Sequence, residues 1–563
     1  MKRNLLFTVA AAGFALAACE SGDINIQPQT TVENSNNTVN EGGGGPVGPN
    51  PCATITSSGT PVQGTYDGTN CTYPDVVGAG NNLTSNLRID ALPNGGAHIF
   101  SGSLFVGNTF NTDAELAAAG IGEGGDGPTL TIEAGSTLAW RTSSDFLVIN
   151  RGSRIIADGT ADAPITFTST TDVEGTVGPE DVQQWGGIVI NGFGSTNKCV
   201  YVGDRTDPDN TGYAVDLTEQ PDGCHVDAEG SQGLDESQYG GANDSDDSGI
   251  LNYVVVKHTG ATVGNGDELN GISFGGVGSG TQVSNLQVYS TFDDGIEMFG
   301  GMFDIDNLVA LYVRDDSIDV DEGYQGTITN ALVVQSESIG NHCIEADGIG
   351  SYSDQVAANN TQAIIDASLN SRIVVNNLTC IISPTPTQGD FDPGAGWRLR
   401  EGLWFEINDS MVITSFAAND QTSANDNYCL RIDDPETQDG ATNGDSELNG
   451  VIYACQETFR TTFESGFAGT EGNVAATIPN DTAVSATAVN DPDLQLLEGM
   501  IPVFSIPFAT SQVDGAVPNA SAAPVGGGDF LGALSLGGMD WTQPWAYGLV
   551  DGNRGQPLWF ETL

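Results

Sequence analysis

The strongest constraint on the fold is a unit that the chain repeats three times between Gly271 and Ser338. Ile272, Ile296 and Ile318 open the three copies. Each copy contains two short runs of alternating apolar and polar residues, separated by glycine or aspartate turns, and no helical run. A unit of roughly 20 residues built from short strands buries its apolar face only against neighbouring copies, as in a solenoid. The sequence therefore predicts an all-β chain folded as a right-handed parallel β-helix solenoid with capped ends.

An asparagine precedes the second strand of each copy. The central copies place it at Asn285, Asn307 and Asn330. The same frame recurs outside them at Asn252, Asn377, Asn408 and Asn449. Asparagine tolerates left-handed backbone, and its amide can bond the equivalent residue of the next coil. We expect these residues to stack at one turn of the β-helix.

Acidic residues dominate the charge of this 563-residue chain. It contains 74 aspartates and glutamates but only 16 lysines and arginines, which gives a formal net charge of −58. Nucleic acid is not expected as a partner, because binding its phosphates requires a basic surface. The charge favours cation binding, solubility, or a salty medium in which charges are screened.

The first residues have the features of a secretion signal. Lys2 and Arg3 precede an apolar stretch that is too short for a mature membrane span. The stretch ends in Leu-Ala-Ala-Cys at Cys19, which resembles the lipobox of bacterial lipoproteins. The resemblance implies cleavage before Cys19 and a lipid on its side chain. Glu20 is not the aspartate that usually retains lipoproteins in the inner membrane, so we expect an outer-membrane anchor, on the cell surface or the periplasmic face. An ordinary secreted protein is the alternative.

With Cys19 assigned to lipid, eight cysteines remain, and they form four sequential couples. In an oxidising compartment we expect the disulfides Cys52–Cys71, Cys199–Cys224, Cys343–Cys380 and Cys429–Cys455. A zinc site is the alternative, but the chain has no C-x-x-C motif and its histidines are scattered.

Changes in composition divide the chain into five predicted parts. These are a signal peptide (1–18), a lipid anchor with a disordered, flexible tether (19–51), a disulfide-stapled N-terminal region and cap (52–124), the parallel β-helix (125–460), and a C-terminal loop region and cap (461–563). Residues 111–122 are predicted to form a helix over the open end. Residues 198–248 interrupt the repeats as an insertion. Trp541, Trp545 and Trp559 are expected to pack on the last coils.

The short strands that follow the aspartate pairs can be aligned in one column. The aligned strands are Ile296–Phe299, Ile318–Asp321, Ile344–Asp347, Leu403–Glu406 and Leu430–Asp433. Their first and third residues are apolar and should point inward, so the second and fourth should face solvent. Neighbouring strands lie about 4.8 Å apart, so acids at these positions would form a ladder.

A ladder of carboxylates needs cations or raised pKa values, because like charges at this spacing repel each other by roughly 1 kcal/mol even in water. Calcium is the expected cofactor, since it accepts six to eight oxygen ligands in loose geometry. The predicted ligands are Asp294, Glu297, Asp316, Asp319, Asp321, Glu345 and Asp347. The alternative is that these acids are simply solvated residues of aspartate-glycine turns.

The same column places Trp404 beside Arg431, which predicts a binding surface for a ligand. Arg431 is also a weak candidate for a catalytic base. A salt bridge from Arg431 to Glu406 or Asp433 is the alternative.

Five segments, in order, resemble motifs of β-helix surface proteins and lipoproteins of Gram-negative bacteria, within the pectin-lyase-like superfamily. They are WGGIVING, NDSDDSGILNYVVV, DELNGISFGGVGSGT, DDGIEMFGG and DEGYQG. The resemblance covers roughly residues 125–460. It implies a parallel β-helix at the cell surface, and some members accompany TonB-dependent outer-membrane receptors.

The expected function is therefore recognition: a calcium-binding surface lipoprotein that captures a ligand, or docks on a TonB-dependent receptor or an extracellular glycan. A calcium-dependent polysaccharide lyase or glycoside hydrolase is the second hypothesis, and a structural or adhesion protein is the third. Polygalacturonase-type hydrolases carry a Gly-His-Gly segment and an Arg-x-Lys, and neither occurs here. Whether the chain is an enzyme stays open at this point.

Overall fold

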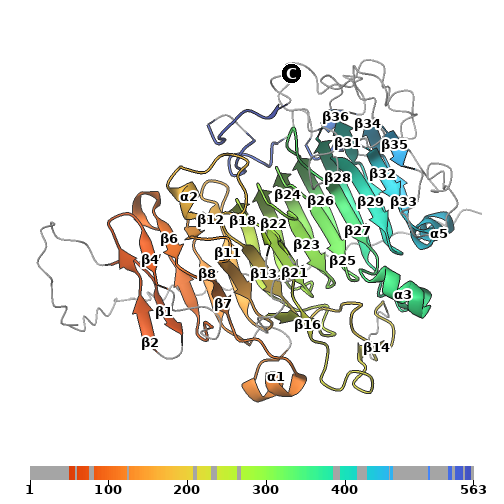
Figure 1. The fold of residues 1–563 in the computed structure, drawn as a ribbon, viewed down its shortest axis with the longest axis horizontal. Coiled ribbons are helices and arrows are strands. Elements are labelled where there is room, and N and C mark those ends of the chain that lie inside the picture. Colours follow the sequence, from red (N-terminus) through yellow and green to blue (C-terminus); the bar gives the residue numbers. More distant parts are fainter. Residues whose placement is uncertain are drawn as a thin grey trace, which may run out of the picture. The chain divides into compact units, whose positions relative to one another are not determined.

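Successive strands in the central part of the chain alternate between two long sheets in the computed structural model (Figure 1). The structure describes residues 50–57, 60–74, 82–122, 126–206, 212–229, 237–262, 268–383, 394–414, 428–454, 457–460, 505–507, 530–534, 539–549 and 552–559. All of them belong to one compact unit, Pro49–Leu563. Cys19 and the predicted signal peptide lie outside the described residues.

The smaller sheet contains ten strands among the described residues, and all its pairs are parallel. From one edge to the other they are β7 (Leu104–Val106), β10 (Phe146–Ile149), β13 (Gly187–Asn191), β21 (Ile272–Gly275), β23 (Ile296–Phe299), β25 (Ile318–Asp321), β27 (His342–Asp347), β29 (Ala395–Arg400), β32 (Tyr428–Ile432) and β35 (Glu457–Arg460).

The larger sheet contains seventeen described strands, and only β3 joins it in antiparallel fashion. They are β3 (Thr65–Tyr66), β4 (Cys71–Tyr73), β5 (Leu87–Ile89), β6 (Ala97–Phe100), β8 (Thr129–Ile132), β9 (Thr137–Trp140), β11 (Arg154–Asp158), β12 (Ile165–Ser169), β18 (Gly249–Lys257), β22 (Gln282–Tyr289), β24 (Ile305–Leu311), β26 (Gln325–Val334), β28 (Arg372–Ile382), β30 (Trp404–Asn408), β31 (Met411–Thr414), β33 (Glu447–Asn449) and β34 (Ile452–Ala454).

The remaining described elements are short. Antiparallel pairs are formed by β1 (Thr54–Ser57) with β2 (Thr60–Gln63), β14 (Tyr201–Val202) with β15 (Ala214–Val215), β16 (Val226–Asp227) with β17 (Gln238–Tyr239), β19 (Ala261–Thr262) with β20 (Glu268–Leu269), and β36 (Ser505–Pro507) with β37 (Phe530–Gly532). The helices are α1 (Asp113–Ala119), α2 (Thr170–Val173), α3 (Tyr352–Ala358), α4 (Thr361–Asp366) and α5 (Pro435–Asn443), with a 3-10 turn at Pro93–Gly95. No helix in these described ranges is long and apolar enough to span a membrane.

The prediction of a mainly β chain with long parallel sheets is confirmed, and the arrangement is consistent with a β-helix. Ile272, Ile296, Ile318 and Ile344 pair in register along the smaller sheet and are fully buried. The isoleucine that opens each repeat therefore forms a row in the core between the two sheets. Parallel pairing already begins within residues 52–124, where β4 pairs with β6 and β5 with β8.

The predicted asparagine stack is present at a bend in the strands of the larger sheet. Asn285, Asn307 and Asn330 all have positive φ, between 49° and 63°. The Nδ2 group of Asn307 donates to Asn285 Oδ1, and that of Asn330 donates to Asn307 Oδ1, both at 3.0 Å. Asn285 donates in turn to Asn252 at 2.9 Å. Farther along the chain the stacked amides belong to Asn376, Asn408 and Asn449. The prediction is wrong for Asn377, which has positive φ but donates to Gly532 O instead.

Replacing Asn307 by valine should lower the free energy of unfolding by roughly 2–4 kcal/mol, because it removes two amide bonds and places a β-branched residue at φ 63°. Urea unfolding measures the change. Asn307→Gly is the matched control: it accepts positive φ but also loses the two bonds, so its cost should be smaller. Equal stability of Asn307→Val and the wild type would contradict the role of the stack.

Three of the four predicted disulfides are present. They are Cys52–Cys71, Cys199–Cys224 and Cys343–Cys380. Cys429 is also disulfide-bonded, and its predicted partner Cys455 lies outside the described residues.

Two predicted caps differ from the structure. Helix α1 forms as expected, but the Asp113 N–H donates to Asp222 O in the insertion, and Figure 1 shows the helix beside the sheets while β1, β2 and β4 occupy the end. Trp545 and Trp559 pack against Val309 and other residues on the outer face of the middle strands of the larger sheet, not on the last coils. The outer face of these middle strands is apolar, and the segment with Trp545 and Trp559 shields it from water.

Candidate functional site

The predicted acidic ladder lies on the outer face of the smaller sheet. Glu297 pairs in register with Asp319, and Asp319 with Glu345, so strands β23, β25 and β27 place their carboxylates side by side. Strand geometry explains this, because the apolar residues on either side of each acid are fully buried and point into the core.

A second row of carboxylates lies at the turn that precedes these strands. The Asp316 N–H donates to Asp294 Oδ1 at 2.9 Å, and the His342 N–H donates to Asp316 Oδ1 at 2.6 Å. The Asp294 N–H donates to Asn270 Oδ1 at 3.2 Å. Each of these side chains is therefore fixed by the backbone of the next repeat.

The ladder was expected to face solvent, and this expectation is wrong for most of its residues. Glu297 is 8% exposed, Glu345 6% and Asp347 7%. Asp319 and Asp321 are partly exposed. The insertion covers part of this face: Ala228 and Tyr239 pack with Phe299 and with apolar residues of neighbouring strands. The solvent exposure of the acids was predicted from strand alternation alone. Alternation cannot show whether a segment distant in sequence covers that face of the sheet.

After Glu345 the predicted alignment is wrong at Leu403–Glu406, whereas Leu430 and Arg431 lie in the predicted column. The next neighbour of Glu345 in the sheet is Arg398 of β29, and Arg398 pairs with Arg431 of β32. Trp404 and Glu406 instead belong to β30 in the larger sheet, where the Trp404 ring lies 3.9 Å from the Arg372 guanidinium. Trp404 and Arg431 are therefore in different sheets. Residues 397–400 and 403–406 both have apolar first and third residues and a charged fourth residue, so the pattern fits either segment.

The structure divides the face into two groups of acids. In the first, the paired cluster, each carboxylate lies beside a basic side chain; its members are Glu345, Asp347, Asp433, His342, Arg398, Arg400 and Arg431. Arg398 Nε lies 2.6 Å from Asp433 Oδ2, and Arg400 Nε lies 2.5 Å from Asp347 Oδ1. Arg431 pairs with Asp433, which is one of the two salt bridges that the sequence suggested for it.

His342 connects this cluster to the turn row. Its Nδ1 lies 2.8 Å from Asp316 Oδ1 and 2.9 Å from Glu345 Oε2, and its Nε2 lies 2.7 Å from the Tyr428 hydroxyl. Burial lowers the pKa of His342, but the neighbouring Tyr428 and carboxylates hold that pKa well above its ordinary value. Burial raises the pKa of Glu345, but His342 and the two nearby arginines hold it well below its ordinary value.

The second group, the acidic cluster, consists of Asp293, Asp294, Glu297, Asp315 and Asp319. Oxygen atoms of Asp293, Asp294 and Asp315 lie within 4.8 Å of one another, as do those of Asp294, Glu297 and Asp319. Asp294 belongs to both triplets. Within the described part of the chain, no lysine, arginine or histidine forms an ion pair with these five residues.

The pKa values of the acidic cluster reflect this lack of positive partners. Burial and the neighbouring Asp315 and Glu229 raise the pKa of Asp293 to about 9. Burial, followed by repulsion from neighbouring carboxylates, raises the pKa of Asp294, Glu297 and Asp319 well above the ordinary values. Without a cation, these groups can remain buried only by keeping protons.

The predicted metal ligands are therefore split between the two groups. Asp294, Glu297 and Asp319 lie in the acidic cluster, whereas Glu345 and Asp347 lie in the paired cluster. Asp316 lies between them, and burial raises its pKa to about 8. Asp321 lies at the end of β25, where burial and Asp347 raise its pKa.

Several residues of the site were missed. His342 lies two positions before Ile344, as Asp294 lies before Ile296 and Asp316 before Ile318, so the repeat frame could have found it. Glu229 of the insertion carries no such signal. The Asn270 Nδ2 group donates to Glu229 at 3.2 Å and to Glu297 at 2.5 Å, which brings Glu229 to the edge of the acidic cluster.

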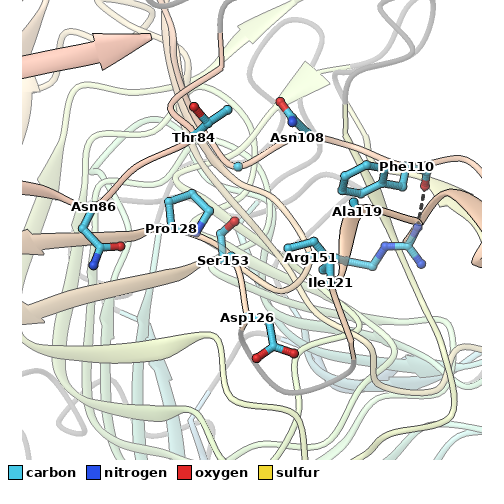
Figure 2. A pocket seen from close by; sticks show the side chains of 12 residues that line it. Thr84, Asn86, Asn108, Phe110, Ala119, Ile121, Asp126, Pro128, Arg151 and Ser153 are labelled. Carbon is cyan, nitrogen blue, oxygen red and sulfur yellow. Dashed lines mark hydrogen bonds between the residues drawn. The ribbon is translucent and has the colours of Figure 1, made fainter. Parts of the chain in front are cut away.

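A cavity of about 380 Å³ lies elsewhere, between α1 and the turns of the first repeats. Figure 2 shows Thr84, Asn108, Phe110 and Arg151 among its lining residues, with the Arg151 guanidinium donating to Phe110 O at 2.9 Å. No residue predicted as a metal ligand or binding residue lines this cavity.

Comparison with protein families gives a match to the model of the pectate-lyase-like β-helix domain over residues 109–491. The chain belongs to that family. The match includes both clusters and the strands of both sheets from β8 to β35 of this pectate-lyase-like β-helix, so it supports the superfamily expected from the sequence motifs. Neither curated proteins nor solved structures give a match.

Proposed function

We propose that the acidic cluster binds calcium and that the protein uses the bound metal for recognition at the outer membrane. The observation that carries the proposal is the contrast between the two clusters. Carboxylates of the paired cluster are offset by three arginines and His342, whereas Asp293, Asp294, Glu297, Asp315 and Asp319 converge with no basic side chain paired to them in the described residues.

Calcium suits this site better than magnesium. The five carboxylates come from two turns and two strands, so they offer many oxygens but no octahedral frame. Calcium accepts such irregular sets, whereas magnesium demands near-octahedral geometry and retains water. Buried like charges also repel far more strongly than exposed ones, which gives a divalent cation a large electrostatic gain.

A role in recognition follows from the charge of the whole chain. A net charge of −58 repels anionic glycans, and a calcium ion on this face would lower the local negative charge and accept an oxygen of an anionic ligand. Arg398, Arg400 and Arg431 continue the same face, but each is paired with a carboxylate, so the bound metal would be the positive group that is left for a ligand. We therefore propose that a lipid-anchored protein, attached through Cys19, captures an anionic ligand or docks on a TonB-dependent receptor or extracellular glycan.

Asp294→Asn and Glu297→Gln test the calcium site directly. Each should weaken calcium binding at least tenfold in isothermal titration, because each removes a charged ligand. In chelator at pH 9, where ionisation of the cluster destabilises the wild type, both variants should unfold at a higher temperature, because each removes one ionisable carboxyl. The exposed Asp90→Asn is the control and should change neither value. A wild type that does not bind calcium at millimolar concentrations would remove the metal from the proposal.

A calcium-dependent polysaccharide lyase is the second candidate function. The observation in its favour is the proximity of arginines to the acids: Arg398 pairs in register with Glu345, which itself follows Asp319. A lyase should cleave a polyuronate with calcium present, and Arg431→Ala should abolish cleavage if Arg431 is the base. A recognition protein should bind the same polymer without cleaving it.

A further inference from the structure

The insertion presents an apolar surface where a hairpin is normally polar. Val200 is 45% exposed, Val202 44% and Leu217 56%, and these are three of the six exposed large apolar side chains in the described residues. Val200 directly precedes β14 and Val202 ends it, so the two valines lie on the face opposite Tyr201. Ala214, paired with Val202, is also exposed. We name these four residues the hairpin patch.

The opposite face of the hairpin already packs on the body of the protein. Tyr201 and Tyr213 stack with their ring centres 5.0 Å apart. The Tyr201 hydroxyl donates to Gly241 O at 2.9 Å, and the Tyr213 hydroxyl donates to Ser195 Oγ at 2.9 Å. An antiparallel ribbon with one face packed is normally polar on the other. The hairpin patch departs from that rule, so its apolar residues need a different explanation.

The hairpin is also held rigidly. The Cys199–Cys224 disulfide closes its base. Arg205, which is 5% exposed, pairs with Asp244 at 2.8 Å and donates to the carbonyls of Gly301 at 2.8 Å and Gly323 at 2.5 Å. A surface that is fixed before binding loses little conformational entropy when a partner docks.

The surroundings of the hairpin patch indicate the charge of its partner. Asp204, Glu219 and Asp222 are exposed around it. The nearby basic residues are engaged elsewhere: Lys198 donates to Gly350 O at 2.9 Å, and Arg205 is buried. A second copy of the chain would bring the same negative rim and be repelled. An apolar centre with an acidic rim is complementary to an apolar surface with a basic rim.

We infer that the hairpin patch is a docking site for a protein partner whose apolar contact surface is flanked by lysine and arginine side chains. This inference does not depend on the calcium site, because none of the residues of the hairpin patch belongs to either cluster.

The test uses three synthetic peptides of equal length, alternating Leu with Lys, Ser with Lys, and Leu with Glu. Fluorescence anisotropy should show that the full chain binds the Leu/Lys peptide at least ten times more tightly than does the variant Val200→Ser/Val202→Ser/Leu217→Ser. The control variant Val173→Ser/Val356→Ser, which alters exposed valines elsewhere, should bind like the wild type. Circular dichroism checks that both variants are folded.

Each other outcome would overturn the inference. Equal binding of the Leu/Lys peptide to the wild type and the triple variant, or no binding to either, would show that the hairpin patch is not a docking site. Equal binding of the Ser/Lys and Leu/Lys peptides would show that charge alone is responsible. Tight binding of the Leu/Glu peptide, or a wild-type dimer that the triple variant loses in sedimentation, would show that the partner is not basic.

Discussion

Removing calcium with a chelator should lower the unfolding temperature of the protein by roughly 8 °C. A ligand that binds only the folded state stabilises it, and at 1,000 times its Kd the gain is about 4 kcal/mol. Each kcal/mol shifts the unfolding temperature of a large domain by about 2 °C. The effect should be large here because the acidic cluster is buried and has no paired cation of its own in the described residues.

Scanning calorimetry with and without excess calcium measures this shift. Magnesium at the same concentration should restore only a small part of it, because the site lacks an octahedral frame. The double variant Asp294→Asn/Glu297→Gln should show no calcium dependence. An unfolding temperature that is the same in calcium and in chelator would rule out the proposed metal site.

The metal-free protein should lose stability steadily as pH rises, which is the second large effect. The pKa of Asp293 is raised to about 9 and that of Asp316 to about 8, and the pKa of Asp294 is also raised. In the unfolded chain these carboxyls titrate near pH 4. Between these pH limits the folded state holds more protons than the unfolded chain. The stability that these protonated carboxyls contribute is therefore fully present below about pH 4 and is lost as pH rises through about 8 to 9.

Several coupled carboxyls contribute, so the free energy of unfolding of the metal-free protein should fall by several kcal/mol between pH 5 and pH 9. Glu345 has the opposite sign: its pKa is lowered, so its contribution disappears only as pH falls below about 4. Thermal unfolding in chelator at a series of pH values measures the slope. Calcium should flatten the profile, because the ionised carboxylates then have a counter-ion. A metal-free protein that is more stable at pH 9 than at pH 5 would contradict the assigned pKa shifts.

Features that recur in every repeat could be predicted from the sequence. The buried row of isoleucines, the stack of Asn285, Asn307 and Asn330, and the ladder from Glu297 to Glu345 all follow from a fixed frame in which strand alternation decides the face. The three disulfides in the described residues were predicted because each joins sequential cysteines.

Features that depend on segments distant in sequence could not be predicted in this way. Alternation assigned Leu403–Glu406 to the smaller sheet because residues 397–400 have the same pattern, and only the pairing of Glu345 with Arg398 decides between them. Ala228 and Tyr239 of the insertion pack with Phe299 on the face that carries the acids. Neither residue stands in any repeat, so no pattern indicated that the insertion would fold back over the face.

The segment that contains Trp545 and Trp559 covers the outer face of the larger sheet, and it is synthesised after the strands that it covers. The Gln287 side chain bonds both backbone groups of Tyr547, 260 residues later, and Trp559 donates to Gln335 O across 224 residues. Until the carboxyl-terminal end has been synthesised, Val309 and Leu332 have no cover over their outward faces. A chain truncated before Trp545 would therefore contain every described strand but expose the apolar outer face of the larger sheet, which favours aggregation or binding by a chaperone.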